Sequence, residues 1–180
     1  MNGGSVTENT ADSGGGVYSN SSGAHFTNVA IKQNWARGQN TGGGGGGIYN
    51  AGSLLLAGVI LEGNASGASG GGLANYGSAN LIATAISENT ATTVGGGVYS
   101  SGCTSFTNVT ISSNQAAQSG GGIAIDNCND VLTNVTIAQN TAPSGAGILT
   151  SLPLYTKNCI VASNLIGGNC YGIGNNGNVW

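Results

Sequence analysis

The chain has 180 residues, of which 35 are glycine, three are Lys or Arg and six are Asp or Glu. A formal net charge of -3, spread along the sequence, provides neither a basic patch for nucleic acid nor a polybasic segment for a membrane surface. No apolar run approaches the length of a membrane-spanning helix, so we expect no membrane span.

An apolar residue three positions before an asparagine recurs seven times, and the asparagines are 25, 30, 25, 25, 26 and 24 residues apart. The copies occupy residues 6–9, 31–34, 61–64, 86–89, 111–114, 137–140 and 161–164. A glycine-rich turn and an apolar residue follow six of them, at residues 14–17, 45–48, 70–73, 95–98, 120–123 and 145–148. A fixed period of this size is typical of a solenoid, in which each coil buries its apolar face against its neighbours.

Within one repeat, Val109, Thr110 and Ile111 alternate between apolar and polar side chains, as in a strand with one buried face. The sequence therefore predicts an all-β fold, a right-handed parallel β-helix of about seven coils of about 25 residues that forms a single domain over residues 1–180. The handedness follows from the general rule for parallel crossovers. We expect residues 35–44 to form an inserted loop and residues 159–180 to form the closing coil.

Both repeated features have a structural explanation. Asparagine tolerates the left-handed backbone conformation of a turn, and stacked amides hydrogen-bond along a rod. Glycine supplies positive φ angles and lets neighbouring backbones approach closely. Because a catalytic site does not recur in every coil, we expect the repeated residues to serve the fold.

The run Ile-Ser-Ser-Asn-Gln-Ala at 111–116, followed by Gly-Gly-Gly-Ile at 120–123, resembles the paired FxxN and GGA(I/L/V) repeats of chlamydial polymorphic outer-membrane proteins. Aliphatic residues replace the Phe of that family, and Gly-Gly-Gly replaces Gly-Gly-Ala. The run 106–114 and the block Gly-Gly-Gly-Ile-Tyr-Asn at 45–50 are similar to bacterial surface proteins of the choice-of-anchor class, which have right-handed β-helix repeats. The resemblance implies a β-helix displayed on a cell surface, and it implies no particular ligand.

The inserted loop of the second coil carries four candidate ligand-binding residues, Trp35, Arg37, Gln39 and Asn40. Loops on a rigid scaffold often carry recognition; the indole could stack on a sugar ring, and the polar side chains could hydrogen-bond to it. Tyr18 and Tyr49 follow inward-facing apolar residues, so we expect them to point outward and stack beside this loop. The patch is a candidate glycan-binding site, and the alternative is a loop without function.

A flat β-solenoid with few charges and rows of threonine could also bind ice, and this is a second binding hypothesis. Thr107 and Thr133 share one phase of consecutive coils, and Thr110 and Thr136 share another. The pattern ends beyond these two coils, whereas a regular lattice would favour an unbroken row.

Cys103 and Cys128 occupy the same phase of consecutive coils. Stacked strands are about 4.8 Å apart, within the Cα separation that a disulfide accepts, so we predict a disulfide between them; two buried thiols are the alternative. Cys159 takes a core position, and Cys170 could close the C-terminal coil. Paired cysteines imply an oxidising compartment and therefore export.

Few residues are suited to catalysis. His25 is the single histidine, and Glu8 and Glu88 share a phase but lie three coils apart. That separation, about 14 Å, is too wide for a carboxylate pair, and no nucleophile elbow is present, so a polysaccharide-cleaving β-helix is disfavoured. The segment Asp-Asn-Cys-Asn-Asp at 126–130 could provide calcium ligands, but a polar turn explains it as well. We expect no catalytic residue, no metal and no cofactor.

The first coil lacks a strand before Val6, and an open β-helix end is a template for stacking. We expect a non-enzymatic protein, extracellular or on the cell surface, that acts as a structural spacer or an adhesin-like surface. Its expected partners are surface glycans or further copies of itself, which would associate through the coil ends. The alternatives are a module that binds glycan or ice on one flat face and the disfavoured polysaccharide-cleaving enzyme.

Overall fold

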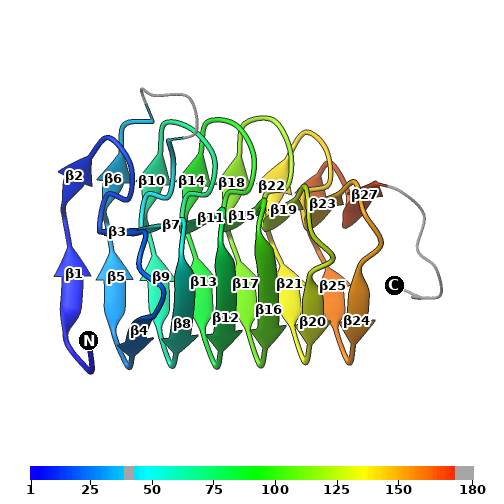
Figure 1. Ribbon diagram of the computed structural model, residues 1–180. Coiled ribbons are helices and arrows are strands. Elements are labelled where there is room, and N and C mark those ends of the chain that lie inside the picture. The colour runs from blue at the N-terminus through cyan, green and yellow to red at the C-terminus, as the bar shows by residue number, and fades with distance from the viewer. Residues whose placement is uncertain (39–42, 173–180) are drawn as a thin grey trace.

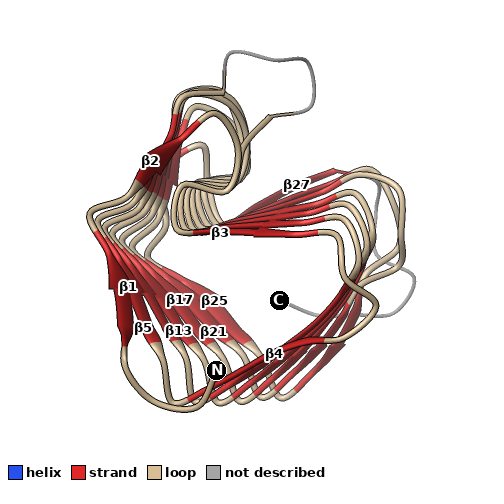
Figure 2. Ribbon diagram, turned by 60° about the vertical axis from the view of Figure 1, so that its left-hand side comes forward, coloured by secondary structure: helices blue, strands red, loops and turns tan. Residues whose placement is uncertain are grey.

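A computed structural model describes residues 1–38 and 43–172, and within these residues the regular elements are all strands. Figure 1 shows the chain winding as a solenoid from the N-terminus to the C-terminus, with each coil stacked on the one before. Seen from its N-terminal end in Figure 2, the chain runs clockwise as it recedes, so the solenoid is right-handed. The predicted all-β fold, a parallel β-helix of about seven coils, is confirmed.

Four parallel sheets form the walls of the solenoid, and most coils contribute one strand to each. Sheet 1 contains β1 (Ser5–Thr7), β5 (Ala30–Lys32), β9 (Ile60–Glu62), β13 (Ala85–Ser87), β17 (Thr110–Ser112), β21 (Thr136–Ala138) and β25 (Ile160–Ala162). Sheet 2 contains β2 (Thr10–Ala11), β6 (Trp35–Ala36), β10 (Ala65–Ser66), β14 (Thr90–Ala91), β18 (Gln115–Ala116), β22 (Thr141–Ala142) and β26 (Leu165–Ile166). Sheet 3 contains β3 (Val17–Ser19), β7 (Ile48–Asn50), β11 (Leu73–Asn75), β15 (Val98–Ser100), β19 (Ile123–Ile125), β23 (Ile148–Thr150) and β27 (Cys170–Gly172). Sheet 4 contains β4 (Ala24–Thr27), β8 (Ser53–Ala57), β12 (Ser78–Ile82), β16 (Cys103–Thr107), β20 (Val131–Thr133) and β24 (Tyr155–Lys157).

The strand register keeps the repeats in phase, and it refines two expectations. Trp35 and Ala36 pair with Ala65 and Ser66, so they belong to sheet 2 and the insertion begins after them. At the N-terminus, Asn2 forms a parallel bridge with Thr27, and the backbone N–H of Thr27 donates to Met1 O at 3.0 Å. The first coil therefore contains the beginning of a strand before β1, which pairs with β4 of sheet 4 and which the sequence did not predict.

One apolar core runs along the inside of the rod. Its largest fully buried side chains are Ile31, Ile48, Leu56, Leu61, Leu73, Leu81, Ile86, Phe106, Ile111, Ile123, Leu132 and Ile137. These are the positions at which apolar residues recur in the sequence, so the predicted inward rows are confirmed. Burying each such side chain contributes about 1.5–3 kcal/mol, which makes this stack the main source of stability.

The predicted asparagine ladder is present, and it lies on the inside of the corner between sheets 1 and 2. At each step, the Oδ1 atom of one asparagine accepts hydrogen bonds from the backbone N and from Nδ2 of the preceding one, as between Asn64 and Asn89 at 2.9 and 3.0 Å. The expectation that the ladder asparagines themselves take the left-handed conformation is wrong, although Asn108 and Asn134, in the turn before sheet 1, do take it. The residue before each ladder asparagine does so, as at Glu88 with φ 59° and Ser113 with φ 56°, because this turn aims the amide inward.

The ladder ends within the last coil. The Oδ1 atom of Asn169 accepts from the backbone N of Asn164 at 3.2 Å and from its Nδ2 at 3.0 Å, although only five residues separate the two. The last two donors of the ladder, the backbone N–H and the Nδ2 amide of Asn164, therefore find their acceptor within the same coil.

The glycine triplets serve the two purposes predicted for them. Gly95, the first of its triplet, has φ +68°, and an added Cβ at Gly97, the third, would lie 2.7 Å from Gly122 O. Larger residues would separate the coils at this corner, and the hydrogen bonds of sheet 3 would be lost.

The predicted disulfide joins Cys103 and Cys128, whose Cα atoms are 5.1 Å apart. Cys159 and Cys170 are free and pack partly buried against the core, so no second disulfide closes the last coil. Near the disulfide, Asp130 is fully buried and its Oδ1 accepts from the backbone N of Thr104 at 2.7 Å. Its Oδ2 has no hydrogen-bond partner among the described residues, and burial raises the pKa of this carboxyl to about 7.

Candidate binding surface

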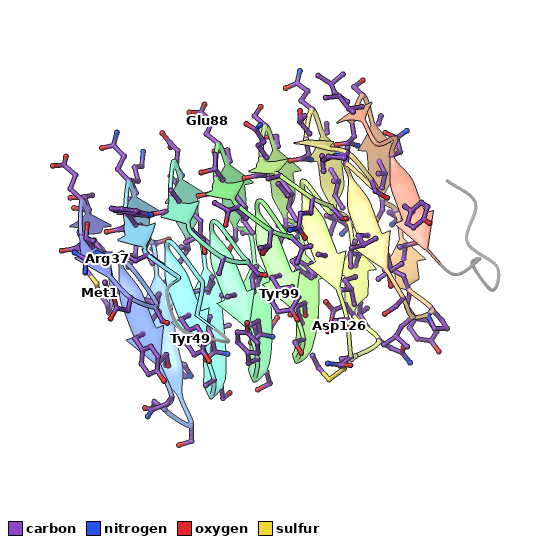
Figure 3. The ribbon with its side chains drawn as sticks, turned by 90° about the horizontal axis from the view of Figure 1, so that it is seen from above. Met1, Arg37, Tyr49, Glu88, Tyr99 and Asp126 are labelled. Carbon is purple, nitrogen blue, oxygen red and sulfur yellow. A yellow bond between two sulfur atoms is a disulfide. The ribbon has the colours of Figure 1, made fainter. Side chains whose placement is uncertain are left out.

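A row of four tyrosines follows the outer face of sheet 3 along the rod. The rings of Tyr18 and Tyr49 stack with centroids 4.9 Å apart and planes 2° from parallel, which confirms that these two side chains stack. Tyr76 continues the row at 5.1 Å from Tyr49, and Tyr99 at 5.6 Å from Tyr76. We call Tyr18, Tyr49, Tyr76 and Tyr99 the tyrosine row; Figure 3, which looks down on the rod, shows Tyr49 and Tyr99 following one another toward Asp126.

The local sequence explains why the row forms. Tyr18, Tyr49 and Tyr99 each follow the apolar residue after a glycine triplet, and that residue points into the core, so the tyrosine points outward. In the coil between Tyr49 and Tyr99, the same position is held by Ala74. Tyr76, two residues later, contacts the rings on both sides, so the row continues past Ala74.

Three members of the tyrosine row have raised pKa values. Burial, and then the neighbouring Tyr99 and Tyr49, raise the pKa of Tyr76 to about 12. Burial also raises the pKa of Tyr49 and of Tyr99. These three phenols therefore remain protonated at neutral pH, so each presents an aromatic face together with a neutral hydroxyl group.

The tyrosine row leads to a hollow on the same face. The hollow has a volume of about 830 Å³, and Tyr99, Ala124, Asp126, Leu149, Ser151 and Tyr171 are among the residues that line it. The Tyr99 hydroxyl donates to Asp126 Oδ2 at 3.2 Å, and the Ser151 hydroxyl donates to the backbone O of Asp126 at 3.0 Å. These bonds hold Asp126 at the edge of the hollow.

The structure describes only part of the candidate patch of the second coil. Trp35 is 49% exposed but lies on β6 in sheet 2, and the ring contacts among the described residues join tyrosines only. Arg37 forms an ion pair with Asp12 at 3.6 Å. Gln39 and Asn40 lie outside the described residues. Ligand binding by Trp35 and its neighbours stays a prediction.

The four threonines of the ice hypothesis pair as their phases predict. Thr107 lies opposite Thr133 in sheet 4, and Thr110 lies opposite Thr136 in sheet 1. The two pairs thus lie on different sheets, and the row in sheet 1 continues with Ala85 on one side and Ile160 on the other. Ice binding also stays a prediction.

The acidic residues are dispersed. Glu8 and Glu88 are at equivalent corners three coils apart, and Glu62 forms an ion pair with Lys32 at 2.9 Å. In the segment 126–130, Asp126 faces the hollow whereas Asp130 is buried, so the two carboxylates point apart. Within residues 1–38 and 43–172, no group of three or more His, Cys, Asp or Glu side chains could hold a metal ion.

Two further findings concern membrane-spanning helices and the N-terminal end of the rod. No helix in the described part of the chain is long and apolar enough to cross a membrane. At the N-terminal end, β1, β2 and β3 are edge strands of their sheets. Self-association through such an end remains a prediction.

The fold and this face define a β-helix repeat protein with an aromatic outer row. Residues 108–126 match the family described as the Chlamydia polymorphic membrane protein (Chlamydia_PMP) repeat. The match runs from Asn108 to Asp126, which is less than one coil and includes β17, β18 and β19, and it confirms the predicted resemblance to these repeats. No curated protein and no solved structure matches the chain. A repeat of this kind points to a surface or outer-membrane protein.

Sequence reasoning identified only part of the surface. Tyr99 carried the same signal as Tyr18 and Tyr49, an aromatic residue directly after the glycine turn and its apolar residue. Tyr76 is out of phase by two positions, so periodicity could not have found it. Tyr171 stands in register with Leu149, but only the register shows that it borders the same hollow as Tyr99.

Proposed function

We propose that this chain is a non-catalytic, rod-shaped element of a cell-surface protein, and that it adheres to its partner through the tyrosine row. The observation that supports this proposal is the continuous row of four tyrosine rings on consecutive coils, each ring in contact with the next. Tyrosine combines a large apolar area with a polar hydroxyl group and loses little conformational freedom on contact, which suits it to recognition surfaces.

The solenoid itself supports the spacer part of the proposal. Adjacent coils are joined by four sheets and by the buried asparagine ladder, so the outer face is carried by a stiff and regular scaffold. With about 4.8 Å between strands, seven stacked strands span about 29 Å along the axis. The rod would both hold the tyrosine row at a distance and present it in a straight line.

The dispersed acidic residues support the absence of catalysis. Glycoside cleavage needs two carboxyl groups within about 10 Å of each other on either side of the bond. Glu8 and Glu88 are three coils apart, and Glu62 is paired with Lys32. Incubation with polygalacturonate and with xylan should therefore release no new reducing ends, and a steady release that scales with protein concentration would contradict this part of the proposal.

Adhesion is tested with polystyrene beads coated with the chain and counted on cultured epithelial cells. We expect the double substitution Tyr49→Ala and Tyr99→Ala to reduce bead adherence several-fold, because it interrupts the tyrosine row. Alanine already occupies the equivalent position of sheet 3 in two other coils, at Ala74 and Ala124, so the fold should tolerate the change. Tyr155→Ala is the control, since Tyr155 is exposed on sheet 4.

Beads that adhere equally with and without Tyr49 and Tyr99 would refute adhesion through the tyrosine row. Beads that do not adhere at all would refute the adhesive role and leave the spacer role alone. Circular dichroism on each variant confirms that the β-helix is retained.

A further inference from the structure

The hollow beyond the tyrosine row has the size of a ligand site. Its volume of about 830 Å³ lies within the range of about 300–1,000 Å³ that is common for small-molecule pockets. Ala124 forms part of its floor, because its small side chain lies between Tyr99 and Leu149 in the register of sheet 3. Tyr99 borders one end along the rod axis and Tyr171 borders the other.

The distance between the two tyrosines determines the shape of the ligand. β15 and β27 are separated by three strand spacings, so Tyr99 and Tyr171 lie about 14 Å apart along the rod axis. A cation held in an aromatic cage needs each ring within about 6 Å of it, which two rings so far apart cannot provide. The hollow therefore suits an extended ligand that reaches from one ring to the other.

The polar groups and the charges determine its chemistry. Asp126 Oδ1 has no hydrogen-bond partner among the described residues, so it is free to accept hydrogen bonds from hydroxyl groups. The three Lys and Arg side chains lie elsewhere: Lys32 and Arg37 are in ion pairs, and Lys157 is on sheet 4. An acidic ligand would meet Asp126 and find no cation in sheet 3.

We propose that the hollow binds a short stretch of a neutral oligosaccharide, laid along the rod axis with its sugar faces against Tyr99 and Tyr171 and its hydroxyl groups donating to Asp126. This assignment rests on the proposed adhesive function, and it names the partner of the surface as a neutral glycan. The tyrosine row continues from the hollow in the same direction, so a longer chain of the same sugar would extend over it.

The test is a titration of the disulfide-intact chain with cellohexaose, maltohexaose and fully N-acetylated chitohexaose, followed by calorimetry and by saturation-transfer NMR. Hexagalacturonate is the acidic comparison. We expect at least one neutral probe to bind, and we expect Tyr171→Ala and Asp126→Asn each to weaken it about tenfold, as the loss of a stacked ring or of a charge-assisted hydrogen bond would. Tyr155→Ala, on sheet 4 and 59% exposed against 63% for Tyr171, should leave the affinity unchanged.

Several results would overturn the proposal. The first is that no neutral probe binds. The second is that hexagalacturonate binds more strongly than the neutral probes. The third is that Tyr155→Ala and Tyr171→Ala reduce the affinity for the neutral probe equally. The bead assay separates this inference from the proposed function. If beads still adhere to cells whose glycans have been oxidised with periodate, and adherence still depends on Tyr49 and Tyr99, the adhesive function stands and the sugar assignment fails.

Discussion

Removing one buried rung of the asparagine ladder, by Asn89→Ala, should destabilise the rod strongly. The Oδ1 atom of Asn89 accepts from the backbone N and from Nδ2 of Asn64, at 2.9 and 3.0 Å. Its Nδ2 donates to Leu61 O at 3.0 Å and to Asn114 Oδ1 at 2.9 Å. All four bonds are buried, so water cannot replace them after the substitution.

The magnitude follows from the groups that are left behind. The backbone N–H of Asn64 becomes an unsatisfied buried donor, which costs about 1–3 kcal/mol, and each further lost hydrogen bond costs about 1 kcal/mol. We therefore expect Asn89→Ala to lower the free energy of unfolding by about 4–6 kcal/mol, a large share of the roughly 5–15 kcal/mol that is typical of a domain.

The assay is urea denaturation followed by far-UV circular dichroism and by tyrosine and tryptophan fluorescence. Asn9→Ala is the matched control, because Asn9 is exposed at the end of the ladder and its side chain donates only to Asn34. Asn9→Ala should lower the free energy of unfolding by less than about 1 kcal/mol. Equal losses for the two variants, or a loss below about 1 kcal/mol for Asn89→Ala, would refute the view that the buried ladder stabilises the rod.

Three further predictions concern charge, covalent linkage and backbone packing. Because burial raises the pKa of Asp130 to about 7, the folded state holds this proton more tightly than the unfolded state does. Stability should therefore fall by up to about 4 kcal/mol as the pH rises from about 4 to about 7, and Asp130→Asn should remove this dependence in denaturation curves at both pH values. Reducing the disulfide between Cys103 and Cys128, which closes a loop of 25 residues, should cost about 3.5 kcal/mol, as should the double serine variant. Thiol titration in denaturant should find Cys159 and Cys170 before reduction and all four cysteines after it. Gly96→Ala should destabilise by more than about 1 kcal/mol in the same urea assay, because its Cβ would lie 2.5 Å from the Gln115 backbone, whereas Gly23→Ala, with open space around its Cβ, should change stability by less than about 0.5 kcal/mol.

The fold could be predicted because every coil obeys the same short-range rules. Alternation around Ile111, the turn before Asn114 and the glycine corner at 120–122 are each visible within one repeat. A solenoid adds only contacts between neighbouring repeats, so equal phase in the sequence becomes contact in space. The disulfide between Cys103 and Cys128 could be predicted for the same reason.

The candidate site could be predicted only in part, because its members depart from that phase. Tyr76 contacts its ring neighbours from two positions beyond Ala74, the residue in register with Tyr49. Asp126 and Asp130 belong to one polar segment, yet one lies at the surface and the other is buried beside Thr104. Asn169 closes the ladder from five residues beyond Asn164, outside the repeat.

By itself, the sequence determined the coil: its length, its inward rows, its buried amide ladder and its pairing of cysteines. Tertiary structure decided which outward side chains meet, as in the four-tyrosine row and the hollow between Tyr99 and Tyr171. The physical reason is that inward positions repeat because each must fill the same narrow core. Outward positions are free of that constraint. Their contacts therefore depend on the geometry of the corners and on where a small residue, such as Ala74 or Ala124, stands in register with a tyrosine. These neighbours are known only once the coils are stacked.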